Sequence, residues 1–127
     1  MIYRSPLPAV AVPAITVPAH VLVHDNDEVA LEDAATGESL TYAELRDRTR
    51  STARGLVAQG IKPGDTVAVT SLNRPGYAVG LHAIMAAGAT AALINPLLTT
   101  QEIERLKILA KVKTTLDLDD LPHDDTA

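Results

Sequence analysis

Residues 65–96 read DTVAVTSLNRPGYAVGLHAIMAAGATAALINP, and this stretch decides the fold. It contains two short apolar runs, residues 66–70 and residues 89–94, in which polar and apolar side chains do not alternate. Such runs are typical of strands that are buried on both faces, as in a parallel sheet. Residues 77–87 between them are long enough for a helix, and Gly88 follows where helices often need a left-handed residue. The stretch therefore predicts a strand–helix–strand unit with two parallel strands.

The segments on either side of this unit predict helices that flank the sheet. Thr41 and Glu44 have the spacing of a capping box, which predicts a helix over residues 41–60. Thr99 and Glu102 repeat that spacing and predict a helix over residues 100–111, followed by a short strand at residues 112–116. The predicted buried faces are Leu45, Thr49, Ala53, Leu56 and Val57 on the first helix, and Ile103, Leu106, Leu109 and Ala110 on the second.

The N-terminal third of the chain predicts an arm, a short helix and a hairpin. Prolines recur in residues 1–17, and each of them favours an extended predecessor, so this segment is expected to be an extended arm. Residues 18–24 predict a short helix. A β-hairpin is expected from residues 28–35 and 38–42, with Val29 and Leu31 on one face and Thr36-Gly37 in the turn. The expected fold class is α/β: a partial, mainly parallel βαβ sheet flanked by helices, with an N-terminal arm and a hairpin.

Composition limits the classes of function. The net charge of −5 argues against a nucleic-acid-binding surface, which is normally basic. The chain has no cysteine, which excludes disulfides and fits a cytoplasmic protein. No apolar run approaches the roughly 20 residues of a membrane span. We divide the chain into the arm, an α/β subdomain at residues 18–116, and an acidic, flexible tail at residues 117–127 with five aspartates but no calcium-binding pattern.

The loop between the first strand and its helix is the best candidate for a phosphate site. Neither of the glycine-rich phosphate-binding motifs is present in the sequence. A helix N-terminus at this position could nevertheless bind an anion. The weak cofactor-binding candidates are therefore Asn73, Arg74 and Gly76. The alternative is structural: Asn73 caps the helix, and Pro75 occupies its first turn.

Other polar groups give no catalytic or metal site. His20 and His24 are four residues apart and could share a helix face, but no third metal ligand is evident. His82 lies among apolar residues and is expected to be a packed side chain. A stripe of arginines at four-residue spacing is either an anion or partner site or, as we favour, a solvated helix face; it comprises Arg46, Arg50 and Arg54.

The order of several short motifs resembles a known family. These motifs are TYAEL at residues 41–45, GIKPGD at residues 60–65, Gly88-Ala89, and Asn95-Pro96 followed by Thr99 and Glu102-Ile103. In this order they resemble the N-terminal region of the adenylate-forming enzymes, which include acyl-CoA synthetases, 4-coumarate–CoA ligases, luciferases and peptide-synthetase adenylation domains. The opening residues 1–6 are similar to bacterial 4-coumarate–CoA ligase-like members. The resemblance covers about residues 1–116.

The resemblance implies a parent reaction in which a carboxylic acid, ATP and CoA give acyl-CoA, AMP and pyrophosphate, with Mg²⁺. The family's Ser/Thr/Gly-rich phosphate-binding loop and its later catalytic motifs are absent here. Residues 124–127 resemble the segment just before that loop, so we expect a shortened chain, truncated before it. We therefore expect no catalytic residue, no cofactor and no activity for this chain alone.

Two other readings stay open. In one, the chain is a non-catalytic binding or self-assembly module whose partner is a second copy or the missing remainder of the enzyme. In the other, it is a nucleotide binder that uses residues 71–76.

Overall fold

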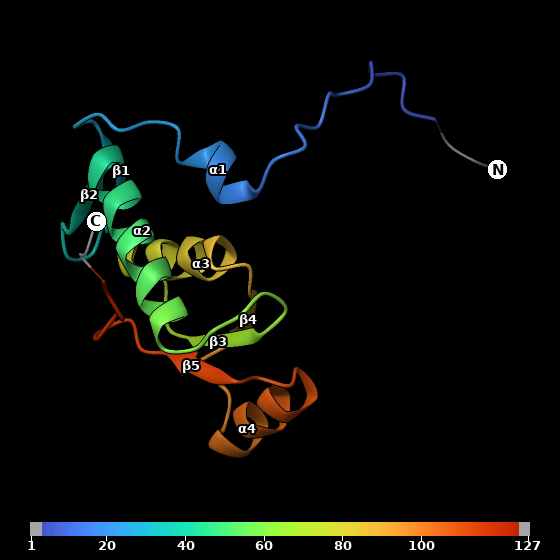
Figure 1. The fold of residues 1–127 in the computed structure, drawn as a ribbon, viewed down its shortest axis with the longest axis vertical. Helices are drawn as coiled ribbons and strands as arrows, with labels where there is room; N and C mark the ends of the chain where they lie inside the picture. The colour runs from blue at the N-terminus through green and yellow to red at the C-terminus, as the bar shows by residue number, and fades with distance from the viewer. Residues whose placement is uncertain (1–3, 125–127) are drawn as a thin grey trace.

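The structure is a computed structural model that describes residues 4–124 (Figure 1). Two sheets are present in this part of the chain: a two-stranded antiparallel hairpin and a three-stranded parallel sheet. The elements follow the order α1 (Val17–Val21), β1 (Val29–Glu32), β2 (Ser39–Thr41), α2 (Tyr42–Ala58), β3 (Thr66–Thr70), α3 (Pro75–Ala86), β4 (Thr90–Ile94), α4 (Thr100–Leu109) and β5 (Thr114–Leu116).

The strand–helix–strand prediction is confirmed. The parallel sheet has the order β4-β3-β5, so the first strand in sequence is the central one. Thr66 pairs with Thr90 and Thr70 with Ile94, which aligns the carboxyl ends of β3 and β4 at one edge of the sheet. The expected α/β class, with a mainly parallel sheet and a hairpin, is thus the observed architecture.

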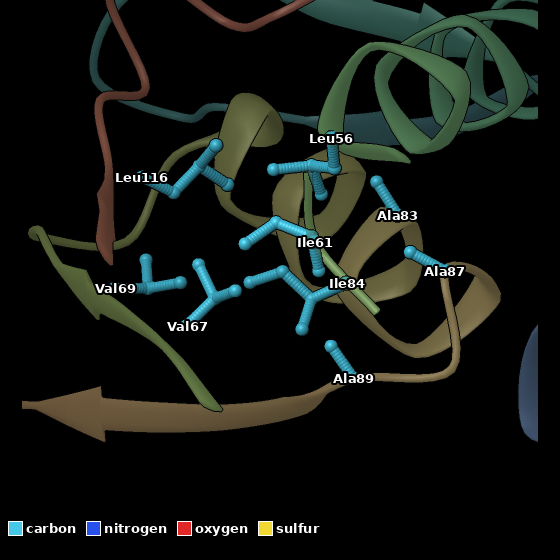
Figure 2. Packing of buried hydrophobic residues seen from close by; sticks show 9 residues of the cluster. All are labelled: Leu56, Ile61, Val67, Val69, Ala83, Ile84, Ala87, Ala89 and Leu116. Carbon is cyan, nitrogen blue, oxygen red and sulfur yellow. The ribbon is translucent and has the colours of Figure 1, made fainter. Parts of the chain in front are cut away.

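The main core lies between this sheet and helices α2 and α3 (Figure 2). Val67 and Val69 of β3 are fully buried against Leu56 of α2 and Ile84 of α3. Alanines 83, 87 and 89 contribute small side chains to the same cluster, so the helices can approach the sheet closely without aromatic residues. Removal of this apolar surface from water stabilises the fold by roughly 25 cal/mol per Å².

Local capping signals place the helices as expected. Thr41 and Glu44 form a complete capping box at the start of α2, and Thr99 and Glu102 form another at the start of α4. Gly88 has a φ of 78°, which confirms the left-handed residue predicted after α3. Helix α3 begins two residues earlier than predicted because Pro75, whose fixed φ suits a first turn, is already helical.

Helix α1 and the hairpin are shorter than predicted. Helix α1 ends at Val21, so His24 lies beyond it and the two histidines do not share a helix face. In the hairpin, a β-bulge between Val29 and Leu31 breaks the expected alternation: Val29 is 56% exposed, whereas Leu31 is half-buried. A bulge inserts an extra residue, which reverses the face of the residues beyond it.

Three predictions of burial are wrong. Leu93 of β4 is 53% exposed because β4 is an edge strand of the sheet, and Val57 of α2 is 56% exposed. Helix α4 has no buried residue: Ile103 is half-buried, and the rest of its predicted stripe, Leu106, Leu109 and Ala110, is exposed. Helix α4 lies on the opposite side of the sheet from α2 and α3, where no further layer of the described chain covers its outer surface (Figure 1).

The described part of the acidic segment, residues 117–124, packs along helices α2 and α3. Leu118 and Leu121 are half-buried against the two apolar clusters. The backbone N–H of Asp124 donates to the carbonyl of Ser51, 3.2 Å away. We call residues 117–124 the strap; its packing differs from the solvated tail that composition suggested, and residues 125–127 lie outside the described part.

The N-terminal arm is described from residue 4 onwards. Residues 4–16 contain no helix or strand and are exposed, and they lead away from the rest of the chain (Figure 1). Residues 1–3 lie outside the described part. Among residues 4–124, no helix has both the length and the apolar character needed to cross a bilayer.

Candidate functional site

The carboxyl ends of β3 and β4 form the most suggestive place for a ligand. In open parallel sheets, ligands bind in the crevice beyond the carboxyl ends of the strands. Here the residues after β3 lead into α3, and the residues after β4 lead towards α4. A cavity of about 290 Å³ opens between these two loops. Its lining is formed by Ser71, Leu72, Asn73, Tyr77, Leu93, Ile94, Asn95 and Pro96.

Two of the three candidate residues from the sequence line cavities at this end of the sheet. Asn73 is exposed and lines both this cavity and a neighbouring one of about 320 Å³ beside the hairpin. Arg74 lines only the neighbouring cavity, together with Glu32 and Asp33. Gly76 lies in the first turn of α3, where an added Cβ would stand 3.9 Å from the carbonyl oxygen of Leu118 in the strap.

The N-terminus of α3 is poorly equipped for a phosphate group. Pro75 is the first helical residue and has no N–H to donate. The N-cap position belongs to Arg74, not to Asn73 as predicted, and its side chain makes no capping hydrogen bond. The Arg74 guanidinium donates to Oδ1 of Asp119 at 2.8 Å, so the strap already supplies its anion.

The polar groups of the β4 loop serve local structure. The Oδ1 of Asn95 accepts from the backbone N–H of Leu97 at 2.9 Å, which forms an Asx-type turn. The hydroxyl of Ser71 donates to the carbonyl of Leu72 at 2.9 Å. These side chains fix the two loops that the cavity separates. Neither loop contributes a nucleophile paired with a base.

None of the three groups with a shifted pKa, Asp65, Glu102 and His82, lines this cavity. Hydrogen bonds from Lys113 and from the backbone of Lys62 lower the pKa of Asp65, before β3. Hydrogen bonds from Thr99 lower the pKa of Glu102 in the α4 capping box. Burial lowers the pKa of His82, whose Nδ1 is buried without a partner among the described residues.

The histidine and arginine candidates separate in space. No three metal-ligating side chains gather anywhere in residues 4–124. His24 packs edge-on against the ring of Tyr42, with centroids 5.4 Å apart. In the arginine stripe, Arg46 pairs with Asp25 at 3.0 Å, whereas Nε of Arg54 donates to the carbonyl of Asp124 at 2.9 Å.

The sequence did not predict the long-range partners of Arg46, Arg54 and Arg74. Asp119 follows Arg74 by 45 positions, and only the path of the strap brings them together. Tyr77 and Leu93 line the cavity because parallel strands end at the same edge of a sheet. The two apolar runs that predicted parallel strands could therefore have pointed to this cavity.

Comparison with known proteins gives a consistent picture. The profile described as "AMP-binding enzyme" matches residues 19–126. The chain is 34% identical over 122 residues to "4-coumarate--CoA ligase 2" of Petroselinum crispum, a match that covers 91% of this chain and 22% of that protein. The chain therefore spans about a fifth of the length of this curated relative.

Solved structures are similar to this chain in fold. The apo structure of MatB from Rhodopseudomonas palustris is 29% identical, with a TM-score of 0.72, over 80% of this chain and 20% of that one. The N-terminal subdomain of NpsA from Klebsiella oxytoca, solved with anthranilyl-AMSN, has a TM-score of 0.72 at 23% identity and is similar in fold. That match covers 80% of this chain and 27% of the NpsA chain.

Proposed function

Because the chain belongs to the AMP-binding enzyme family, we propose that it supplies the start of the N-terminal subdomain of an ATP-dependent carboxylic acid–CoA ligase. The parent reaction joins a carboxylic acid to CoA and converts ATP to AMP and pyrophosphate. We propose that this reaction takes place in the cytoplasm. The observation that carries the proposal is the family match over residues 19–126, and the similarity in fold to MatB, with a TM-score of 0.72, supports it.

We further propose that the 127-residue chain does not carry out this reaction by itself. ATP would need donors for its phosphates and a cation site. At the edge where β3 and β4 end, Arg74 is already paired with Asp119, and Pro75 offers no N–H. Residues 4–124 hold no cluster of metal ligands, and the sequence has no glycine-rich phosphate loop. The residues present therefore do not fit ATP, and we assign them no catalytic step.

The test is ATP–pyrophosphate exchange by the purified chain, with a panel of aryl and fatty carboxylic acids. The full-length 4-coumarate–CoA ligase 2 of Petroselinum crispum is the positive control. We expect exchange from the control and none above background from this chain. Exchange that scales with the amount of pure chain would overturn the proposed inactivity.

A thermal melt with and without Mg·ATP tests the nucleotide-binding alternative. A ligand that binds only the native state raises the melting temperature. We expect no shift, because Arg74 in this loop is already paired with Asp119 and Pro75 has no N–H to donate. A rise that Arg74→Ala abolishes would support a nucleotide site there instead.

One observation favours a second candidate function, a self-assembly or binding module. Helix α4 exposes Ile108 and Leu109, at 75% and 69%, and the loop before it exposes Leu97, at 81%. Strands β4 and β5 each leave one edge of the sheet without a partner in the described chain. Exposed apolar patches and unpaired edges both favour association. A strictly monomeric protein at high concentration in light scattering would count against this function.

A further inference from the structure

Strand β4 presents an open edge on one side of the parallel sheet. In residues 4–124 it pairs with β3 alone (Figure 1). The N–H of Thr90 points towards β3 and donates to the carbonyl of Asp65 at 2.8 Å. In a parallel strand, the N–H and C=O of one residue point to the same side, and the side alternates along the strand. Ala91 and Leu93 therefore direct both backbone groups outwards, where these groups have no hydrogen-bond partner in the described chain.

The other strands in residues 4–124 carry features that protect a sheet edge. Strands β2 and β5 have three residues each, and Lys113 directly precedes β5. Strand β1 has a bulge between Val29 and Leu31 and ends at Glu32. Short length, lysine side chains, inserted bulges and charges are the usual means of preventing a sheet edge from pairing with another chain. Strand β4 has none of them: it runs for five uncharged residues and keeps a regular register with β3.

The charge pattern around β4 favours pairing with an identical segment. Residues 83–101 contain no aspartate, glutamate, lysine, arginine or histidine. A two-fold arrangement brings the same surface of two copies together, so any charge near the axis would face a like charge. Here that repulsion is absent over the whole strand and the loops on both sides of it. A second copy of this chain is therefore the partner that the edge fits.

We propose that β4 pairs antiparallel with β4 of a second copy, about a two-fold axis at Ala92. Ala91 of each copy then lies opposite Leu93 of the other, and the two residues exchange both backbone hydrogen bonds. Every outward N–H and C=O of the strand gains a partner. The joined sheet runs β5-β3-β4 in one copy and β4-β3-β5 in the other. This inference deepens the self-assembly function and rests on it, whereas the ligase proposal does not depend on it.

The same register covers an exposed apolar side chain. Ala91 packs against the main core, so Ala91 and Leu93 both project from the α3 side of the sheet. Leu93 is 53% exposed, and in the dimer it packs on Ala91 of the other copy. Assembly through this edge stops at two copies, because neither copy then has a free β4 edge. A strand pair of this length is small beside the roughly 1,200–2,000 Å² of stable interfaces, so the dimer is weak and reversible.

Single cysteines test the register, because the sequence contains no other cysteine. The axis places residue 92 of the two copies directly opposite, with Cβ atoms about 4.5–5.5 Å apart, close enough for a disulfide after a small adjustment. Residue 90 of one copy instead lies opposite Ile94 of the other. We expect Ala92→Cys to form disulfide-linked dimers at least about tenfold faster than Thr90→Cys, although Thr90 is the more exposed. Equal or faster cross-linking of Thr90→Cys would overturn the proposal.

A matched pair of lysine substitutions in the Ala92→Cys chain tests the edge itself. Leu93→Lys adds a charge at the edge, and Val57→Lys adds the same charge on α2, at a position of similar exposure (53% and 56%). Thermal melts establish that both variants are folded. We expect Leu93→Lys to slow cross-linking about tenfold and Val57→Lys to leave it within about twofold. Equal effects would indicate a general charge effect and would contradict the edge.

Hydrogen exchange of the unmodified chain gives a test without any substitution. Samples at about 20 µM and about 1 mM are compared, with light scattering on the same samples. We expect the amides of Ala91 and Leu93 to exchange at least about threefold more slowly in the concentrated sample. The amide of Thr114 is the control: the N–H of Lys113 donates to Thr66 in β3, so that of Thr114 points away from the sheet at the β5 edge.

The two measurements separate failure of this inference from failure of the function on which it rests. If the chain associates but the amides of Ala91 and Leu93 exchange at the same rate in both samples, β4 is not the interface, and the self-assembly function stands. If the chain is monomeric in both samples, the inference and the self-assembly function are both wrong. Slower exchange at Ala91 and Leu93, with Thr114 unchanged, supports both.

Discussion

At the scale of single residues, Thr49 gives the clearest stability prediction. Its hydroxyl is buried without a partner in the described chain, so the folded state carries the cost of its desolvation. Thr49→Val keeps the shape and removes that cost. We expect the free energy of unfolding to rise by about 1 kcal/mol in a urea titration.

Thr52 supplies the control for this change. It is also buried on α2, at 3% exposed, but its hydroxyl is not among the buried atoms that lack a partner. Thr52→Val should therefore lower the free energy of unfolding, or leave it unchanged. A loss of stability in Thr49→Val equal to that in Thr52→Val would show that the Thr49 hydroxyl does find a partner in solution.

Asp65 should make stability depend on pH in the acid range. Its carboxylate accepts from Nζ of Lys113 and from the backbone N–H of Lys62, both at 2.8 Å, and these bonds lower its pKa in the folded state. A carboxylate with a lowered folded pKa stabilises the fold above its unfolded pKa of about 3.9, and this contribution is lost as the pH falls through the folded pKa. Asp65→Asn should therefore lower the melting temperature at pH 7.

The difference between Asp65→Asn and the parent chain should shrink below about pH 4, where the parent loses the same charge. Asp47→Asn is the control, because Asp47 is exposed and forms no ion pair in residues 4–124. A melting difference for Asp65→Asn that stays constant from pH 7 to pH 3 would contradict the role of its charge.

Features set by neighbours in sequence were predictable from the sequence, whereas those set by distant partners were not. The capping boxes at Thr41 and Thr99 and the left-handed Gly88 depend on residues within one turn. The ion pair of Arg74 with Asp119 depends on where the strap runs, and no local pattern specifies that. This is why Arg74 looked like a free anion-binding group in the sequence.

At the scale of elements, glycines set the fit between the strap and helix α2. A Cβ on Gly55 would stand 2.6 Å from the backbone of Pro122 and His123, closer than real Cβ contacts. Gly55→Ala should therefore displace the strap, even though alanine favours a helix by about 1 kcal/mol over glycine. We expect faster hydrogen exchange and faster proteolysis in residues 117–124.

Gly76→Ala is the matched control for the strap. Gly76 is also helical and also lies under the strap, but its added Cβ would be 3.9 Å from the carbonyl of Leu118, an ordinary contact. This variant should be neutral, or more stable by up to about 1 kcal/mol. If the strap is equally protected from hydrogen exchange and proteolysis in both variants, the backbone at Pro122 moves away from the new methyl group without a loss of stability.

The burial of whole elements was harder to predict than their existence. The periodicity of residues 100–111 correctly predicted helix α4, but not that its apolar stripe would be exposed. Periodicity marks the face that can be buried, and a further layer must be present to bury it. For the same reason the apolar run of β4 suggested two covered faces, whereas the strand lies at an edge of the sheet.

At the scale of the whole molecule, the outer surface of α4 should govern solubility. Ile108→Glu together with Leu109→Glu replaces side chains that are 75% and 69% exposed, so the melting temperature should change little. The added charges should reduce self-association, because they interrupt the exposed apolar patch. Light scattering over a range of concentrations measures the effect.

Val10→Glu together with Val12→Glu is the control for that pair, because it adds the same charge and both valines are 85% exposed on the arm, away from α4. If association decreases equally with either change, net charge is responsible rather than the α4 surface. If the parent chain is monomeric throughout, the self-assembly function loses its support.

The strand order β4-β3-β5 also determines when each strand of the sheet can find its neighbours during synthesis. Strand β3 is made before both of its neighbours, and Val67 can pair with Thr114 only once the ribosome has added almost fifty further residues. Until β4 has been made, this strand, the most buried one in the described chain, has no hydrogen-bonding partner, and until β5 follows it can be paired on one side only. Non-local parallel pairing of this kind slows folding and exposes the nascent chain to aggregation. Synthesis speed and chaperone supply should therefore affect the yield of this chain more than its equilibrium stability does.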